Sequence, residues 1–220
     1  MIGSIMTSKY EGEATVTLLD DGRNVRLESE LVFIDADSLR WPVPKGAVVD
    51  GASIPKLFWS VIGGPFEGKY RKASIIHDWF CDRRTRSWQA THKVFYEAML
   101  ASQVLVAHAK IMYFTVLRFG PRWDERVTIN NNIENAINVA AAPVVPIVTV
   151  SFVAVAALMV AGITKITVSV PNPGDATTDD EKTFVVELVA KQITDLNISI
   201  MEIEKLAELN TEALIAQLSR

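Results

Sequence analysis

The sequence predicts an α+β domain, followed by one transmembrane helix and a C-terminal amphipathic helix. Apolar and polar residues alternate between residues 13 and 50, and the apolar period becomes helical between residues 69 and 119. No charged residue occurs from 136 to 164. A run of strands followed by a run of helices is typical of α+β domains. The uncharged stretch exceeds the roughly 20 residues that cross a bilayer.

Three short antiparallel strands are expected to form one small sheet. The segment EATVTLL begins at Glu13, and an Asp21-Gly22 turn separates it from NVRLESELVFI at residues 24–34. A third extended segment, LRWPVPKGAVVD, contains Pro42 and Pro44. Because proline cannot donate to a ladder, this segment is limited to an edge strand or a loop.

A cluster of three to four helices is expected next. Ser53 is placed as the N-cap of a short helix that ends near Trp59. After a glycine-rich break, helical periodicity covers about 69–83, 87–102 and 105–119, and Gly120-Pro121 ends the last stretch. The folded domain is therefore assigned to residues 1–125, with a linker helix at 126–138.

The segment 139–164 is interpreted as a single transmembrane helix. The alternative is a buried core helix, although buried helices seldom run so long without a polar face. Arg118, Arg122 and Arg126 precede the segment, and Lys165 and Lys182 follow it. The positive-inside rule then predicts a single-pass membrane protein with its N-terminal domain in the cytoplasm.

Charge and cysteine content exclude several classes of protein. The chain has 220 residues and a net charge of −4, with no long basic stripe, so nucleic acid is not an expected partner. The lone cysteine, Cys81, excludes an internal disulfide framework and an all-cysteine zinc site.

One segment, HDWFCDRRTRSWQATHKVF, is rich in groups that bind metals or move protons. On a helix, His77 and Cys81 share one face and Asp78 and Asp82 share the next, since residues four apart stack. His77 and Asp78 would point roughly 100° apart. His92, on the following helix, is placed to close the site.

Candidate catalytic residues are therefore His77, Asp78 and His92. A transition-metal site made of His77, Cys81 and His92 is a further hypothesis. Structural interpretations compete with both, because Cys81 is more often a small buried hydrophobe and Asp82 fits a solvated helix end. His108 is treated as structural.

Three segments together resemble a known family. VVDGASIPKLFWSVIGGPFEGKYRKASIIHDWFCDRR, THKVFYEAML and MYFTVLRFGPRW are similar to a phage- and prophage-borne family called domain of unknown function 1353. The resemblance covers about residues 28–123. It implies a phage or prophage gene product in a bacterial host, and it brings no established reaction.

A weaker resemblance links the His-Asp helix to phospholipase A2 domains. That likeness implies a calcium ion held by Asp78 and by carbonyls of a loop containing Gly63, Gly64 and Gly68, with His77 as the base.

The same residues depart from the phospholipase pattern. Cys81 replaces an expected tyrosine and His92 replaces the aspartate that orients the histidine. A second histidine cannot orient an imidazole as a carboxylate does.

The tail is expected to form a polar linker at 165–180 and an amphipathic helix at 181–220. Thr178 and Glu181 form a capping-box pattern before this helix. An apolar seam follows at Val189, Ile193, Leu196, Ile200, Ile203, Ala207 and Leu214. The seam fits either a coiled coil that makes a homo-oligomer or a helix folded back on its own domain.

Two functional hypotheses follow. The favoured one is a membrane-anchored, non-catalytic module that binds a phage or host protein or assists assembly. The alternative is a metal-assisted hydrolase, acting on lipid or cell-wall material through His77 and Asp78 with a divalent cation, calcium or zinc. Whether the protein is an enzyme stays open.

Overall fold

The computed structural model describes residues 8–21, 24–50, 68–123 and 178–218. The strands among them are β1 (Lys9–Glu11), β2 (Val16–Leu18), β3 (Val25–Leu27), β4 (Leu31–Ile34), β5 (Arg40–Val43) and β6 (Val48–Val49). The helices are α2 (Arg71–Arg83), α3 (Trp88–Ala101), α4 (Val106–Phe119), α7 (Asp179–Leu196), α8 (Ile200–Glu208) and α9 (Thr211–Leu218). Antiparallel strands followed by helices confirm the α+β part of the prediction.

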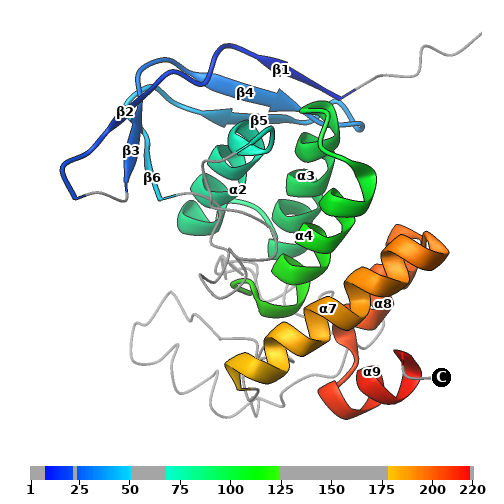
Figure 1. Cartoon of the computed structure of the whole chain (residues 1–220). Helices are drawn as coiled ribbons and strands as arrows, with labels where there is room; N and C mark the ends of the chain where they lie inside the picture. The colour runs from blue at the N-terminus through cyan, green and yellow to red at the C-terminus, as the bar shows by residue number, and fades with distance from the viewer. Residues whose placement is uncertain (1–7, 22–23, 51–67, 124–177, 219–220) are drawn as a thin grey trace, which may run out of the picture. The chain divides into compact units, whose positions relative to one another are not determined.

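Two antiparallel sheets replace the single predicted sheet. Their strand orders are β1-β4-β5 and β2-β3-β6. The first sheet contacts α2 and α3, and the second contacts α2 through β6 (Figure 1). The segment 24–34 contains β3 and β4, and these two strands belong to different sheets. The chain therefore passes from one sheet to the other within this segment. Pro42 of β5 lies opposite Val32 of β4. Strand β5 is at the edge of its sheet, which confirms the edge position predicted from Pro42.

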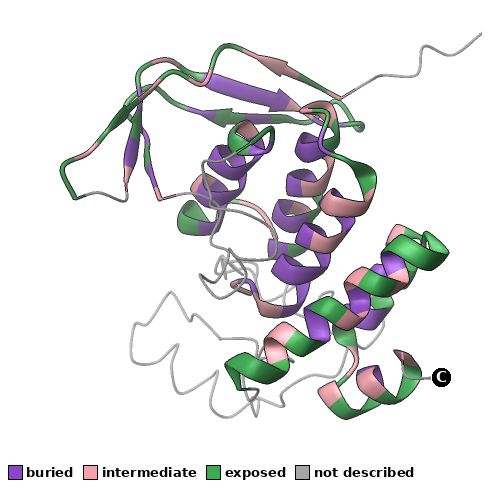
Figure 2. Cartoon of the chain, viewed as in Figure 1, coloured by how far each residue is buried: buried purple, intermediate pink, exposed green. Residues whose placement is uncertain are grey.

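Helices α2, α3 and α4 lie where the periodicity predicted them, and local signals explain the start of α3 and the end of α2. The Ser87 hydroxyl accepts from the amide of Ala90 at the start of α3. Arg84 ends α2 in the left-handed conformation with φ 51°. The faces that these helices turn toward one another and toward the sheets are buried (Figure 2). The predicted helix from Ser53 lies outside the described residues.

The tail forms three helices, so the prediction of one continuous amphipathic helix is wrong. Asn197 breaks the chain after α7 with φ 47°, and Ser199 starts α8 with a second capping box. The capping box at Thr178 and Glu181 is confirmed.

The apolar seam of the tail packs within its own chain. Both α7 and α8 contact α4, and Val189, Ile193 and Ile203 are buried. This is the folded-back arrangement that the sequence left open. The seam is not continuous, because Leu196 is 67% exposed beside the break.

The predicted transmembrane helix is contradicted. No helix in the described part of the chain has the length and apolar character needed to span a bilayer. The longest, α7, has 18 residues and carries aspartates at its start and Lys191 within it. The predicted segment, 139–164, lies outside the described residues. The single-pass membrane association and the localisation with a cytoplasmic N-terminal domain rested on that helix, so they are corrected with it.

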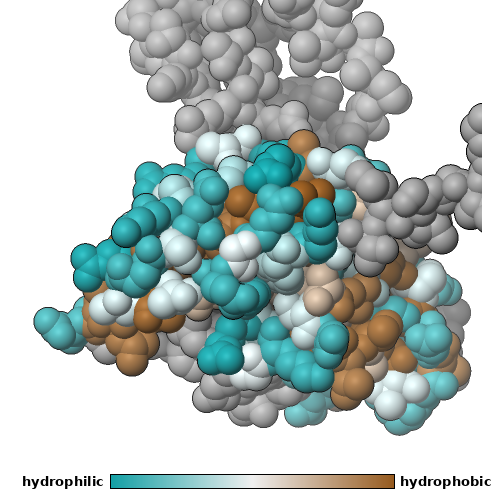
Figure 3. Space-filling model, turned by 90° about the horizontal axis from the view of Figure 1, so that it is seen from above, coloured by the Kyte–Doolittle hydropathy of each residue, from teal (hydrophilic) through white to brown (hydrophobic). Residues whose placement is uncertain are grey.

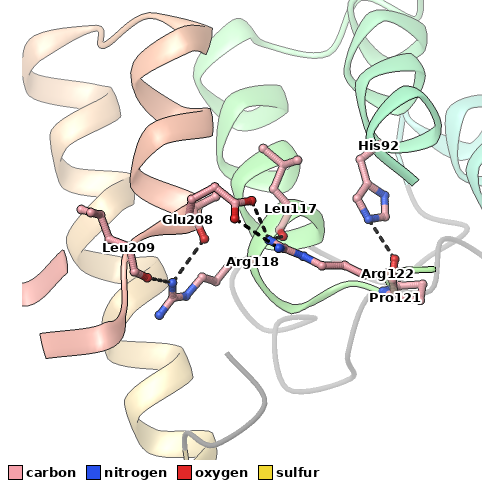
Figure 4. Close-up of polar contacts among 8 residues, drawn as sticks. His92, Leu117, Arg118, Pro121, Arg122, Glu208 and Leu209 are labelled. Carbon is pink, nitrogen blue, oxygen red and sulfur yellow. Dashed lines mark hydrogen bonds and ion pairs between the residues drawn. The ribbon is translucent and has the colours of Figure 1, made fainter. Parts of the chain in front are cut away.

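Two of the arginines assigned to a membrane flank bind the tail instead. Arg118 is buried and donates to the carbonyls of Ala207 and Leu209 (Figure 4). Arg122 pairs with Glu208 at 3.0 Å. The positive-inside argument therefore counted charges that hold the fold together.

Candidate functional site

Helix α2 buries the histidine of the His-Asp pair. His77 has no exposed surface, and its ring centroid lies 4.6 Å from that of Phe95 and 5.1 Å from that of His92. His92 is also fully buried. The two helices α2 and α3 pack so closely that two histidines 15 residues apart meet in the interior.

The two imidazoles are joined directly. Nε2 of His77 lies 2.8 Å from Nδ1 of His92, and Nε2 of His92 lies 3.2 Å from the carbonyl oxygen of Pro121 (Figure 4). A carbonyl only accepts, so the proton of the neutral His92 ring is on Nε2. Its Nδ1 therefore presents a lone pair to His77.

Burial keeps both rings neutral. It lowers the pKa of His77 from 6.5 to about 3. Burial is also the main cause that lowers the pKa of His92 well below 6.5, and the neighbouring His77 and Arg122 lower it further. Desolvation disfavours the charged imidazolium, so both histidines are uncharged at neutral pH.

Cys81 completes a cluster with the two histidines. One helical turn after His77, its Sγ lies 3.5 Å from Nε2 of that ring. Ligand atoms of His77, Cys81 and His92 all lie within 4.8 Å of one another. We call these three residues the His-Cys-His cluster. Its atoms are of the kinds that transition metals prefer.

Asp78 leaves the helix in another direction, as the 100° rotation predicted. Its Oδ2 accepts from the backbone amide of Asp50 at 2.8 Å. It also lines a pocket of about 390 Å³. The other residues that line this pocket are Asn24, Val48, Val49, Asp50, Cys81, Asp82, Arg84 and Pro121.

The pocket and the His-Cys-His cluster are neighbours. Cys81 belongs to both. Pro121 lines the pocket, and its carbonyl accepts from His92. Cys81 and Pro121 are therefore shared between the lining of the pocket and the surroundings of the cluster.

The structure brings together most of the residues that the sequence singled out. His77, His92 and Cys81 meet, and Asp78 lies beside them on the pocket side. Gly68 has φ +65° before α2, and Gly63 and Gly64 lie outside the described residues. The roles assigned to these residues in catalysis or calcium binding stay predictions.

Sequence reasoning missed two groups that form hydrogen bonds to the candidate site residues. The carbonyl of Pro121 and the amide of Asp50 are backbone groups, and no side-chain pattern marks them. The four-residue spacing of His77 and Cys81 was the signal for the cluster, although a lone cysteine at this position also fits ordinary burial.

Comparisons with known proteins give one family match and two uncharacterised relatives. Residues 25–116 match the family described as "Protein of unknown function (DUF1353)". The chain is 49% identical over 108 residues to "Uncharacterized protein y4jT" of Sinorhizobium fredii (strain NBRC 101917 / NGR234). It is 41% identical over 108 residues to "Uncharacterized protein y4iH" of the same strain.

The similarity covers part of each protein. The matched segment is 49% of this chain, 32% of the first relative and 45% of the second, so the chain spans less than half the length of either. No solved structure matches the chain. Neither a phage origin nor a likeness to phospholipase A2 emerges from these comparisons. Residues 25–116 are therefore similar to the family described as protein of unknown function (DUF1353).

Proposed function

We propose that the domain is a non-catalytic binding module, with the pocket beside α2 as its binding site. The burial of His77 carries this proposal. A general base must reach the proton that it removes, directly or through one water. The His77 ring has no exposed surface, and its Nε2 bonds His92, so the ring serves the packing of α2 on α3.

The pocket has the chemistry to bind a basic group. Three acidic residues, Asp50, Asp78 and Asp82, are among the residues that line it, together with one basic residue, Arg84. The face seen from above in Figure 3 is hydrophilic over much of its middle, with hydrophobic residues gathered at the right and at the lower left. Complementary charge gives specificity and speeds encounter, so an amine or guanidinium on a partner protein is the favoured ligand.

Nuclear magnetic resonance titration of the full chain with short peptides tests the proposal. A lysine- and arginine-rich peptide should shift amide signals of β6 and of the second half of α2, whereas a glutamate-rich peptide of equal length should not. Equal responses to both peptides, or shifts confined to other elements, would contradict it.

A variant pair sharpens the test. The Asp82 side chain is 73% exposed, so Asp82→Asn should leave folding intact. It should weaken binding of the basic peptide by about two- to fivefold, which corresponds to the free energy of one exposed ion pair. Asp37 is exposed and is not among the pocket residues, so Asp37→Asn is the matched control and should bind as the parent does.

One observation favours the alternative of a metal-assisted hydrolase. Asp78 lines the pocket and follows His77 directly in α2, so a carboxylate faces the space in which a substrate would lie. Release of fatty acid from phospholipid, or of fragments from cell-wall material, by the full chain with calcium or zinc would support this function if Asp78→Asn abolished it without unfolding. An origin in a phage or prophage gene also stays a prediction, which the neighbouring genes would test.

A further inference from the structure

We infer that the His-Cys-His cluster is a binding site for one transition-metal ion, with Zn²⁺ as the favoured ion. His77 and Cys81 come from one face of α2, and His92 comes from the facing side of α3. Their three ligand atoms lie within 4.8 Å of one another in the interior. This site is separate from the carboxylates of the pocket, and it stands whether or not the pocket binds a basic partner.

Two of the three interatomic distances can be compared with those of a tetrahedral zinc site, and both lie within about half an ångström of it. With Zn–N of about 2.05 Å and Zn–S of about 2.3 Å, tetrahedral angles place nitrogen and sulfur about 3.6 Å apart. The distance from Cys81 Sγ to His77 Nε2 is 3.5 Å. The same geometry needs the two nitrogens about 3.3 Å apart, and they lie 2.8 Å apart. A shift of about half an ångström between α2 and α3 side chains would admit the ion.

The hydrogen bond of His92 fixes the tautomer that a metal requires. A ligating histidine commonly donates its second ring N–H to a carbonyl or carboxylate, which orients the ring. His92 donates from Nε2 to Pro121, so its Nδ1 lone pair points into the cluster. On metal binding, Nε2 of His77 must exchange its proton for the ion, and Cys81 must lose its thiol proton.

The donor set selects the ion. Two imidazole nitrogens and a thiolate suit Zn²⁺ or Co²⁺, whereas Ca²⁺ and Mg²⁺ prefer oxygen ligands. Three protein ligands leave a fourth position open. Because Cys81 and Pro121 also line the pocket, the pocket is the nearest described space from which an ion could enter, and the fourth ligand would be water from that side.

Without a metal ion, a chain of hydrogen bonds would account for the same interatomic distances. In that chain Cys81 donates weakly to Nδ1 of His77, 3.8 Å away, His77 donates to His92, and His92 donates to Pro121. The two interpretations differ in one measurable property, which is whether the sulfur bonds a metal.

Titration of the reduced, metal-free full chain with Co²⁺ is the direct experiment. We expect one equivalent to produce a sulfur-to-cobalt charge-transfer band and the intense visible bands of four-coordinate cobalt, and one equivalent of Zn²⁺ to bleach both. We also expect Zn²⁺ to raise the melting temperature and excess Ca²⁺ to leave it unchanged. These readouts need no variant, so they remain decisive if substitutions in the core unfold the protein.

Two substitutions assign the ligands. Cys81→Ser keeps the size of the side chain, and it should remove the charge-transfer band and weaken Zn²⁺ binding by at least about a hundredfold. His108 lies on α4, outside the cluster, so His108→Gln is the matched control and should bind as the parent does. The inference is overturned if folded parent protein gives no sulfur-to-cobalt band, or if Cys81→Ser binds Zn²⁺ as tightly as the parent.

Discussion

The Nζ of Lys110 in α4 lies 2.9 Å from the Oδ1 of Asn197, the residue that ends α7. The same ammonium donates to the carbonyl of Ile198 at 2.6 Å. The last carbonyls of a helix have no partner within it and carry partial negative charge. Neither acceptor is a carbonyl of α7 itself, so Lys110 acts by placing a buried cation beside the negative end of the α7 dipole.

Replacing Lys110 by methionine should loosen the tail. The change keeps most of the side-chain volume, removes the charge, and leaves two acceptors unpaired at a position that is 6% exposed. Hydrogen bonds to charged groups are worth about 1.5–3 kcal/mol, and we expect a loss of that order in the free energy of unfolding. Hydrogen exchange should accelerate most in α7 and α8.

Lys93→Met is the control for Lys110→Met. The Lys93 side chain is 56% exposed, and it pairs with Glu97 at 3.9 Å. Exposed pairs of this kind are worth little, so the change should cost less than about 0.5 kcal/mol. Equal losses for the two lysines would show that the tail does not depend on Lys110.

Asn197 has two separable roles, in the left-handed backbone and in the contact with Lys110. Asn197→Gly keeps the backbone freedom needed at φ 47° and removes only the acceptor. Asn197→Val removes the acceptor and also strains the turn. We expect urea denaturation to rank the parent as most stable, then the glycine variant, then the valine variant. A valine variant as stable as the glycine variant would contradict the role of the backbone.

Gly120 is required because no space exists for a larger residue. A Cβ at this position would lie 2.3 Å from the carbonyl oxygen of Val116, although φ of −76° suits any residue. Gly120→Ala must therefore distort the end of α4, with a cost of about 1–3 kcal/mol in thermal or urea unfolding.

The control for Gly120→Ala is Gly46→Asn. Gly46 has φ +82°, and the position that a Cβ would take there is open space. Asparagine tolerates left-handed backbone better than most residues, so this substitution should cost less than Gly120→Ala. A Gly120→Ala protein as stable as the parent would show that the end of α4 shifts freely.

Local signals predicted α2, α3 and α4 well. Ser87 and Gly120 mark helix ends through their own chemistry, so the ends of α3 and α4 could be placed from sequence. The strands were harder, because alternation in residues 24–34 does not reveal that the chain changes sheets. The proline in β5 correctly limited that strand to an edge.

The tail and the site needed tertiary information. Asn197 interrupts a pattern of three- and four-residue spacing that looks continuous in the sequence, and Lys110 lies far from it along the chain. Helical spacing placed His77 and Cys81 on one face, but the approach of His92 depends on how α2 packs on α3. The membrane prediction used hydropathy and flanking charge, which do not reveal that Arg118 is occupied by the carbonyls of the tail.

Acid should destabilise the metal-free protein through its buried histidines. In the folded state the pKa of His77 is lowered to about 3, and that of His92 is also lowered, whereas an unfolded histidine titrates near 6.5. Between these values the unfolded chain binds protons that the folded chain does not. Stability is therefore fully present above about pH 6.5 and falls as pH decreases toward 3, by up to about 1.4 kcal/mol per pH unit for each histidine.

Urea denaturation in EDTA at pH 7, 6 and 5 measures this slope. His92→Gln removes one of the two histidines and should reduce the slope by up to half, even if it lowers stability at pH 7. His108→Gln, at a histidine on α4 outside the pair, is the control for a histidine-to-glutamine substitution as such. Carboxylates contribute to the same range mainly below about pH 5, because their ordinary pKa values are near 4. If the stability of the parent protein does not change from pH 7 to 5, the two rings take up protons in the folded state. The assignment of His77 and His92 as a neutral pair with fixed tautomers would then be wrong.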